Sequence, residues 1–308
     1  MNLQQLEYLI AVDHYRHFAK AAESCHVTQP TLSMMIQKLE DELGIKIFDR
    51  SRQPVCPTDA GVEIINQAKV ILKESDRLVE MAKAARNFIG GELRVGVIPT
   101  IAPYLLPLFI QSFHEKYPEV QLKISELITE QIMEKLDYDE LDAGILVPPE
   151  KEKGIIEMPL YTEAFVVYSP KEFEKEFLLA EDINVNELLL LEEGHCFRSQ
   201  ILKFCELRKT HKNTIEYTSG SLETLRNLAD RHLGITILPE LATLNFNLDQ
   251  LKKTKQFAKP RPVRKVSLVM KRGYVKRRLI DLFVEEIKTN LPKDLIDEDE
   301  RVVPFVRI

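Results

Sequence analysis

The stretch that decides the N-terminal fold is Val27-Thr28-Gln29-Pro30-Thr31-Leu32-Ser33. Thr28 carries the small hydroxyl that caps helix starts, and Pro30 sits in the first turn, where a missing N–H costs nothing. Apolar residues then recur with helical spacing until Gly44, at Leu32, Ile36, Leu39 and Leu43. This pattern predicts a helix that begins after Thr28, buries one face and stops at a glycine.

Two shorter helices are expected before it, one with apolar positions between Leu3 and Val12 and one over Phe18–Cys25. Together the segments predict a helix-turn-helix, whose second helix presents small polar residues to a DNA major groove. The candidate DNA-contacting residues on that helix are Thr28, Gln29, Pro30, Thr31, Ser33 and Gln37. The motif alone leaves a generic three-helix packing unit open as an alternative.

A β-hairpin wing is expected next, because residues 45–48 and 54–57 flank a polar turn. Arg50 and Arg52 lie in that turn, where they are expected to contact phosphates. The first 60 residues hold six Lys or Arg against eight Asp or Glu, and the whole chain has a net charge of −6. Any DNA contact must therefore come from the placement of charge and not from its sum.

A long helix is predicted from Thr58 to about Asn87, because apolar residues recur along it among balanced charges. Such a helix exposes apolar surface unless it pairs with a second copy. Gly90-Gly91 follows as a hinge. From Glu92 strands and helices alternate, which predicts a parallel sheet with helices on both faces. A second unit of this kind is expected from Phe165, with later strands at 188–191, 215–217 and 235–238.

The composition, 44% hydrophobic and 29% charged over 308 residues, is that of a soluble globular protein. No leader and no uncharged apolar run of membrane-spanning length is visible, so we expect a cytoplasmic protein. Four cysteines are too few for a disulfide scaffold. No metal or other cofactor is expected, because the cysteine spacing fits no common zinc pattern.

Cys196 and Cys205 lie nine positions apart in a segment with helical periodicity. On a helix their thiols would be about 13 Å apart, whereas a disulfide needs Cα atoms within about 7 Å. A bond between them would therefore be a switch that requires rearrangement. Inert buried thiols are the other interpretation, and we assign Cys25 and Cys56 to that class.

The N-terminal motifs, taken together, resemble the signature of LysR-type transcriptional regulators. The matching residues are Ala21-Ala22, residues 27–33, residues 39–44, residues 47–50 and residues 58–61. The resemblance implies a winged helix-turn-helix domain at 1–58, a dimerising linker helix and hinge at 59–91, and a two-lobed α/β regulatory domain at 92–308 similar to periplasmic binding proteins. Lobe I would span about 92–162 and 265–308, and lobe II about 163–264.

Within that family the chain is most similar to the hydrogen-peroxide sensors, through residues 96–100, 103–107, 191–198, 204–205, 221–227 and 234–236. That resemblance implies a peroxidatic Cys196, a resolving Cys205 and a peroxide pocket of Thr100, Thr129, His195 and Arg264. It also implies promoter DNA, RNA polymerase and a cellular thiol reductant as partners, and a homodimer that assembles into a homotetramer. Ser199 replaces an Asp of the best-known members, so we expect altered oxidation kinetics.

Two rival functions remain. The first is a LysR-type regulator that binds a small metabolite between its lobes, at the turns 98–100, 127–129 and 218–221, with incidental cysteines. Those turns carry hydroxyls and backbone N–H groups that suit a small polar or anionic ligand, although plain helix capping explains each of them singly. The second is a thiol peroxidase, which the linked DNA-binding unit argues against.

Overall fold

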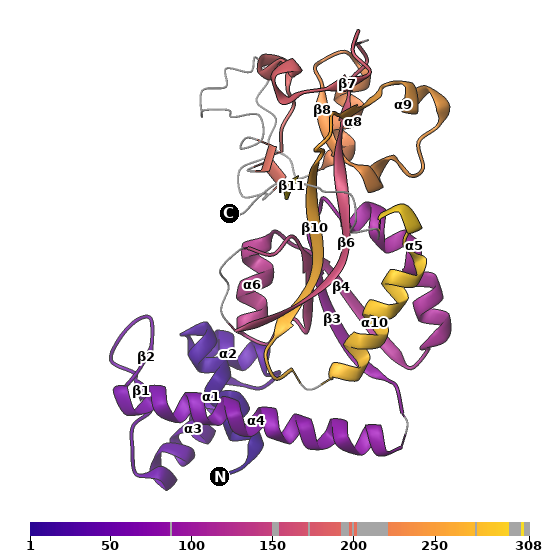
Figure 1. Ribbon diagram of the computed structural model, residues 1–308. Coiled ribbons are helices and arrows are strands. Elements are labelled where there is room, and N and C mark those ends of the chain that lie inside the picture. The colour runs from indigo at the N-terminus through magenta and orange to yellow at the C-terminus, as the bar shows by residue number, and fades with distance from the viewer. Residues whose placement is uncertain are drawn as a thin grey trace. The chain divides into compact units, whose positions relative to one another are not determined.

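The computed structural model describes residues 1–86, 88–149, 154–171, 173–191, 197–198, 200–201, 221–274, 276–295 and 303–304. The predicted site residues His195, Cys196 and Cys205, together with Ser199, lie outside the described residues. The chain divides into two compact units, Met1–Phe88 and Ile89–Ile308 (Figure 1). No helix in the described part of the chain is long and apolar enough to cross a bilayer.

The N-terminal unit contains the predicted helix-turn-helix and wing. Its elements are α1 (Leu3–Tyr15), α2 (Phe18–Ser24), α3 (Gln29–Leu43), β1 (Phe48–Asp49), β2 (Cys56–Pro57) and α4 (Asp59–Ala85). Thr28 caps α3 by accepting a hydrogen bond from the Thr31 N–H, and Gly44 ends it in the left-handed conformation at φ 71°. The buried face of α3 carries the expected Leu32, Ile36 and Leu39. Leu43, the fourth residue of the expected stripe, is 38% exposed because the helix ends there. The predicted helix and its capping residues are therefore confirmed.

The apolar stripe of α4 has two different environments. Ile65 and Ala68 are buried in the core of the N-terminal unit. Further along the helix, Val70 is 52% exposed, Leu78 71% and Met81 67%. The second half of α4 therefore presents apolar side chains that the described part of this one chain leaves uncovered.

The first lobe of the C-terminal unit has the predicted alternation of strands and helices. It contains β3 (Gly91–Val97), α5 (Ala102–Lys116), β4 (Val120–Glu126), α6 (Thr129–Asp137) and β5 (Ala143–Leu146). The strand order is β4-β3-β5 and both pairings are parallel. Figure 1 shows α6 on one side of this sheet and α5 with α10 (Arg277–Asn290) on the other. The layered α/β arrangement expected from residue 92 onward is thus present.

Two long antiparallel strands, β6 (Ile155–Tyr168) and β10 (Pro262–Lys271), join the first lobe to a second. On β6, Leu160 and Tyr161 belong to the hydrophobic core of the first lobe, whereas the run Phe165–Tyr168 belongs to that of the second. The two strands therefore pass between the cores. Whatever lies on them midway is fixed by both lobes.

The second lobe differs from the expected parallel unit. It holds β7 (Phe177–Leu178), η1 (Ala180–Asp182), η2 (Val185–Glu187), α8 (Leu222–Asp230), β8 (Thr236–Pro239), η3 (Glu240–Thr243), α9 (Leu248–Lys252) and β9 (Thr254–Phe257). Strands β8 and β9 pair antiparallel with β6. The run 188–191, expected as a strand, contributes an isolated parallel bridge between Leu188 and Ile235. Its apolar pattern reflects burial and not ladder pairing, while residues 215–217 lie outside the described residues.

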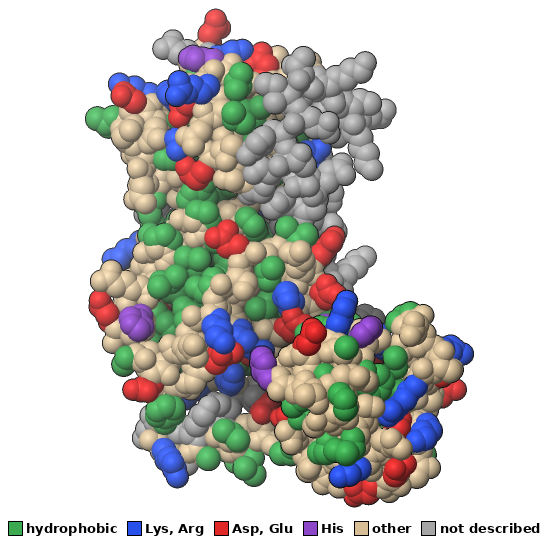
Figure 2. Space-filling view, turned by 180° about the vertical axis from the view of Figure 1, so that it is seen from behind, with side chains coloured by type: hydrophobic (Ala, Val, Ile, Leu, Met, Phe, Trp, Pro, Cys, Tyr) green, Lys and Arg blue, Asp and Glu red, His purple; other side chains and the backbone are tan. Residues whose placement is uncertain are grey.

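Two short elements complete the described chain, η4 (Lys293–Leu295) and β11 (Val303–Pro304), which pairs parallel with β10. Figure 2 shows side chains of both charge signs intermixed on the face that it presents, with hydrophobic groups between them. That distribution agrees with the nearly balanced composition. Within the described residues, no group of three or more His, Cys, Asp or Glu side chains is arranged to hold a metal ion.

Candidate functional sites

A buried ion pair lies on the paired strands β6 and β10, at the point where they pass from one lobe to the other. Glu163 and Arg264 are directly opposite each other in the strand register. Their side chains are 0% and 1% exposed, and the shortest distance between a guanidinium nitrogen and a carboxylate oxygen is 2.8 Å. Arg264 Nε donates to Glu163 Oε1. Arg264 Nη1 donates to Thr100 Oγ1 at 2.9 Å, and Nη2 to the Thr100 carbonyl at 3.0 Å.

The second carboxylate oxygen of Glu163 accepts the Leu241 N–H at 2.9 Å. Leu241 lies on η3 and its side chain packs in the core of the first lobe, so the pair connects the Thr100 turn with η3. Burial raises the pKa of the Glu163 carboxyl, against the opposing effects of the Arg264 charge and the Leu241 N–H. Burial also raises the pKa of Tyr161, whose hydroxyl has no hydrogen-bond partner among the described residues. The middle of β6 and β10 thus holds a buried polar cluster among apolar core residues.

Arg264 also contacts the segment that carries the cysteines. Its guanidinium carbon lies 5.2 Å from the centre of the Phe197 ring and 6.0 Å from that of Phe165. Phe197 is the residue after Cys196 in the chain. Gln200, one turn further on, is buried and its Oε1 has no hydrogen-bond partner in the described part of the chain. The guanidinium of Arg264 therefore lies close to the ring of Phe197, which follows the predicted reactive thiol Cys196 in the chain.

The structure thus brings together two of the four residues expected in a peroxide pocket, Thr100 and Arg264. Thr129 is half-buried at the first residue of α6. His195 lies outside the described residues. Glu163 and Gln200 were not expected from the sequence, because a polar residue in a strand or helix pattern gives no sign that it is buried.

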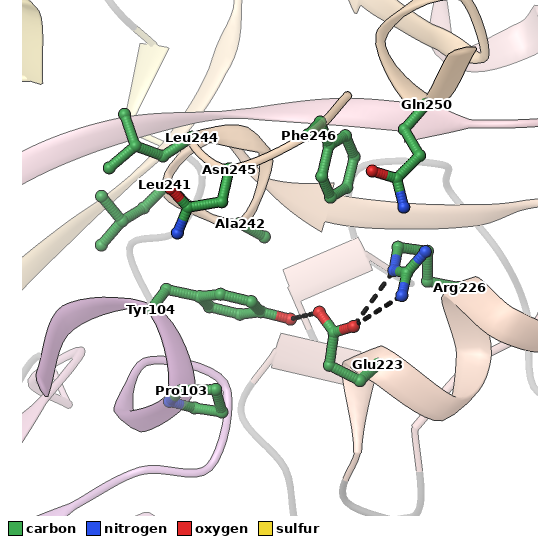
Figure 3. Close-up of a pocket in the computed structure, with 10 residues that line it drawn as sticks. All are labelled: Pro103, Tyr104, Glu223, Arg226, Leu241, Ala242, Leu244, Asn245, Phe246 and Gln250. Carbon is green, nitrogen blue, oxygen red and sulfur yellow. Dashed lines mark hydrogen bonds and ion pairs between the residues drawn. The ribbon is translucent and has the colours of Figure 1, made fainter. Parts of the chain in front are cut away.

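A separate cavity of about 300 Å³ lies between the lobes (Figure 3). Its lining comes from the start of α5, from α8 and from the segment η3 to α9, and consists of Pro103, Tyr104, Glu223, Arg226, Leu241, Ala242, Leu244, Asn245, Phe246 and Gln250. The turns 98–100 and 127–129, expected to hold a ligand, are not part of this lining. The Tyr104 hydroxyl donates to Glu223 Oε1 at 3.0 Å and so links the two lobes.

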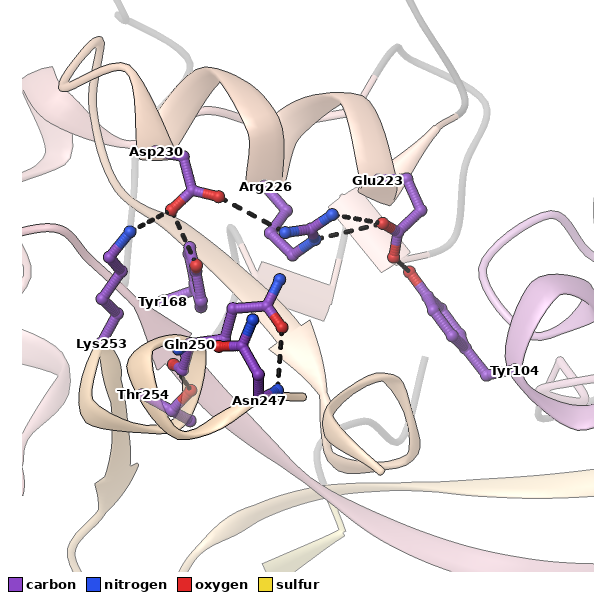
Figure 4. Close-up of polar contacts among 9 residues, drawn as sticks. All are labelled: Tyr104, Tyr168, Glu223, Arg226, Asp230, Asn247, Gln250, Lys253 and Thr254. Atoms are coloured by element: carbon purple, nitrogen blue, oxygen red, sulfur yellow. Dashed lines mark hydrogen bonds and ion pairs between the residues drawn. The ribbon is translucent and has the colours of Figure 1, made fainter. Parts of the chain in front are cut away.

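The charged groups of this cavity belong to a continuous chain of polar contacts (Figure 4). Arg226 binds Glu223 on one side at 2.9 Å and Asp230 on the other at 3.3 Å. Asp230 also accepts from the Tyr168 hydroxyl at 2.8 Å and from Lys253 at 2.6 Å. Burial and the neighbouring Asp230 raise the pKa of Tyr168 to about 12. Each charge that lines the cavity is therefore already paired within the protein.

The N-terminal unit presents most of the predicted DNA-contacting residues to solvent. Gln29, Pro30, Thr31 and Gln37 are exposed along α3, while Ser33 is half-buried and accepts a hydrogen bond from Arg50 Nη1 at 3.1 Å. Arg52 is 70% exposed and lies 3.1 Å from Asp49 across the wing turn. These side chains form one polar edge on α3 and the wing.

A second buried glutamate, Glu40, fixes this edge. One of its oxygens accepts the N–H groups of Ile47 at 2.8 Å and Phe48 at 3.2 Å. The other accepts from Arg50 Nη2 at 3.2 Å, and the Arg50 guanidinium stacks 4.9 Å above the Phe18 ring. Arg50 is therefore anchored on α3, whereas the sequence predicted an extended wing-tip position. Glu40 was missed because its partners come from a different segment.

Cys25 and Cys56 are free thiols of intermediate exposure in this unit. Burial raises the pKa of Cys25, which Ser24 partly opposes. Cys56 donates to the Pro54 carbonyl at 3.3 Å. Burial thus disfavours the Cys25 thiolate, and Cys56 is hydrogen-bonded to the backbone, which agrees with a structural role for both residues.

Comparison with known proteins assigns both units. Residues 3–62 match the model of the bacterial regulatory helix-turn-helix proteins of the lysR family, and residues 86–292 match the LysR substrate binding domain. The chain belongs to the LysR family of transcriptional regulators. It is 36% identical over 94% of its length to the hydrogen peroxide-inducible genes activator of Dickeya chrysanthemi, of which 96% is covered.

Two further LysR-family proteins are similar over nearly the whole chain. The DNA-binding transcriptional dual regulator OxyR of Escherichia coli is 37% identical over 94% of this chain and 96% of its own length. A solved full-length OxyR variant from Pseudomonas aeruginosa aligns with a TM-score of 0.74 and 36% identity, over 94% of this chain and 99% of the other. The winged helix-turn-helix and the two-lobed α/β domain expected from the sequence are therefore confirmed.

Proposed function

We propose that this LysR-family protein senses hydrogen peroxide through a reversible Cys196–Cys205 disulfide and controls the transcription of oxidative-stress genes. The observation that carries the proposal is the similarity, over 94% of the chain, to relatives named as peroxide-responsive regulators. The buried Arg264 and Thr100 beside Phe197 support it, because they place hydrogen-bond donors and positive charge next to the segment that contains Cys196.

The chemistry consists of two balanced steps. The Cys196 thiolate attacks one oxygen of hydrogen peroxide, so that an S–O bond forms, the O–O bond breaks and hydroxide leaves with a proton as water. The Cys205 thiol then attacks the Cys196 sulfenic acid, which forms the S–S bond and releases a second water. Arg264 favours the thiolate by its charge, and Thr100, Thr129 and His195 supply donors to the peroxide oxygens. A cellular dithiol reductant reverses the switch.

The output is a change in DNA contacts. Thr28, Gln29, Pro30, Thr31, Ser33, Gln37, Arg50 and Arg52 contact the operator through base edges and phosphates. The exposed apolar half of α4 pairs with the same surface of a second copy, and two dimers form a homotetramer. The oxidised and reduced forms present different interfaces, which alters the spacing of the DNA-binding units and their relation to RNA polymerase. The protein works in the cytoplasm and turns over no substrate in steady state.

DNA footprinting of reduced and oxidised protein tests this proposal. The probe is a fragment enriched from random DNA by the reduced protein, and the oxidant is near-stoichiometric hydrogen peroxide. We expect the protected region to change on oxidation, and Cys196→Ser and Cys205→Ser to keep the reduced footprint. Cys56→Ser is the matched control and should respond like the natural protein. An unchanged footprint in every form would contradict the proposal.

A metabolite-responsive regulator is the second candidate, favoured by the 300 Å³ cavity between the lobes. A ligand there would contact Tyr104 and Arg226 and would raise the thermal midpoint by mass action. Under this alternative a Cys196→Ala variant would respond normally to the metabolite. Thermal unfolding against a panel of small polar metabolites, with and without peroxide, separates the two functions.

A further inference from the structure

We propose that Glu163 is a positioning residue for the reaction of Cys196 with peroxide, because it fixes the guanidinium of Arg264 beside Phe197, the residue that follows Cys196 in the chain. This inference rests on the proposed peroxide function and goes beyond it. It names a residue that contacts neither thiol in the proposed chemistry. It acts through Arg264.

The first step of the argument is the restraint on Arg264. Glu163 Oε1 binds the guanidinium along its Nε edge, and the Thr100 hydroxyl and carbonyl bind its Nη atoms. With partners on both edges, the planar guanidinium cannot rotate without breaking a charge-assisted hydrogen bond. The guanidinium carbon lies 5.2 Å from the centre of the Phe197 ring. Nη1 retains a second N–H that no described residue accepts, so one donor remains for a thiolate or a peroxide oxygen.

The second step is the restraint on Glu163 itself. Its backbone is paired with Arg264 in the β6–β10 register, and its other oxygen is held by the Leu241 N–H. The carboxylate is therefore held by η3 on one side and bound to Arg264 on the other. A shift of η3 relative to the Thr100 turn would move Glu163 and, with it, the guanidinium of Arg264. The geometry thus makes the orientation of Arg264 depend on the placement of η3.

A purely structural role must be separated from positioning, since any carboxylate here would compensate the buried charge of Arg264. Two substitutions make the separation. Glu163→Asp keeps the charge but withdraws the oxygens by one methylene, so Arg264 loses its fixed partner. Glu163→Gln keeps an oxygen in place for Arg264 Nε but turns the amide NH2 toward the Leu241 N–H. Glu157→Asp is the matched control, because Glu157 is also on β6 and binds Ser267 across the strands, at 2.8 Å.

The experiment uses the reduced full-length protein mixed with hydrogen peroxide between pH 5 and pH 9. The reaction is quenched by alkylation, and the Cys196 peptide is quantified by mass spectrometry, because the chain has no tryptophan to report the reaction. The rate constant for Cys196 oxidation and the pH midpoint of that rate are measured for each variant. Urea unfolding in parallel gives the folded fraction. The pH midpoint of the oxidation rate separates the two roles, because a purely structural role would lower the stability to urea without moving this pH midpoint.

We expect Glu163→Asp to lower the rate constant about 10- to 100-fold and to raise the pH midpoint, because a misplaced Arg264 stabilises the thiolate less. Glu163→Gln should keep its midpoint at or below the natural value, since Arg264 stays in place with its charge no longer offset. Glu157→Asp should change neither quantity. A Glu163→Asp variant whose pH midpoint equals that of the natural protein would overturn the inference. If the natural protein itself does not react selectively at Cys196, the proposed function fails instead.

A double substitution covers the case in which Glu163→Asp does not fold. Arg264→Lys keeps the charge but cannot bind Glu163 and Thr100 at once. If Glu163 acts through the fixed guanidinium of Arg264, Arg264→Lys alone should raise the pH midpoint, and adding Glu163→Gln should not raise it further, since that change only removes a negative charge. An Arg264→Lys midpoint at the natural value, or a further rise on adding Glu163→Gln, would overturn the inference.

Discussion

Two buried glutamates, one in each unit, bind arginines in different ways. Glu40 in the N-terminal unit accepts two backbone N–H groups, from Ile47 and Phe48, and pairs with an Arg50 that is 36% exposed. Glu163 in the regulatory domain accepts a single backbone N–H, from Leu241, and its arginine is fully buried. The first carboxylate holds two backbone N–H groups as well as the partly exposed cations Arg50 and Lys46, whereas the second holds one N–H and a fully buried charge.

This difference separates a structural role from a functional one. Glu40 ties the wing to α3, and its arginine contributes stacking and charge at the edge of the domain. One carboxylate oxygen of Glu163 binds the Arg264 side chain between the two lobes. A purely structural core would favour apolar residues at such a position. We therefore expect substitutions of Glu40, whose arginine is partly exposed, to affect stability, and substitutions of Glu163, whose arginine is fully buried beside Phe197, to affect reactivity.

The largest effect is expected for Glu40→Leu. The substitution leaves two buried N–H groups and Arg50 without their acceptor, so the N-terminal unit should lose about 3–5 kcal/mol of unfolding free energy. Urea unfolding monitored by far-ultraviolet circular dichroism measures the loss. Glu42→Gln on the exposed side of α3 is the control and should keep the natural midpoint. A Glu40→Leu protein of natural stability would remove the contrast between the two glutamates.

Asp142 provides a test of the same contrast through pH. Burial works against ionisation of Asp142, but the Arg94 side chain and N–H outweigh it, and the pKa of this carboxyl is lowered. A lowered folded pKa stabilises the fold above the ordinary aspartate value of about 3.9, and this stability is lost as pH falls below it. The pKa of Glu163 is raised by burial, so its effect on stability has the opposite pH dependence and weakens the fold as pH rises.

Asp142→Asn should therefore cost about 1–3 kcal/mol at neutral pH and should flatten the loss of stability below about pH 4. Urea midpoints at intervals from pH 3 to pH 7 measure both quantities. Because the side chain is 2% exposed and its Arg94 partner 32%, this carboxylate belongs with the structural class. If the urea midpoints of the variant and the natural protein fell equally steeply between pH 4 and pH 3, the lowered pKa of Asp142 would contribute nothing to stability.

Gly61→Ala tests how tightly the wing is held from the α4 side. A Cβ at Gly61 would lie 2.1 Å from the Ile47 carbonyl oxygen, which is backbone and cannot move aside like a flexible side chain. We expect a loss of about 1–3 kcal/mol through overpacking, seen as a lower urea midpoint of the N-terminal unit. Ala60→Ser, at the exposed neighbouring position, is the control. Equal midpoints for both variants would mean that the junction between wing and α4 relaxes easily.

The smallest effect on stability is expected for Arg52→Ala, because this side chain is 70% exposed and its ion pair is with Asp49 in the same turn. The urea midpoint should not change. The slope of log affinity against log salt should fall by about one phosphate contact, as measured by fluorescence anisotropy with operator DNA. Arg50→Ala should instead lower both the urea midpoint and DNA affinity. An unchanged salt slope in Arg52→Ala would remove Arg52 from the DNA interface.

Local patterns predicted much of the fold. The cap at Thr28, the stop at Gly44 and the apolar spacing between them specify α3, and alternation from residue 92 specifies the parallel sheet. The antiparallel strands of the second lobe were missed, because pairing with β6 is set at long range. The resemblance to peroxide sensors placed Arg264 and Thr100 together. Glu163 was missed because its partner Arg264 is 101 residues away.

Free-thiol counting with disulfide mapping tests the central claim most directly. The reduced protein contains four cysteines, and it is treated with near-stoichiometric hydrogen peroxide before alkylation and peptide mass spectrometry. We predict the loss of two thiols and a peptide that links Cys196 to Cys205, while Cys25 and Cys56 remain alkylated as internal controls. Survival of all four thiols would contradict the peroxide switch and leave a LysR-family regulator with another effector.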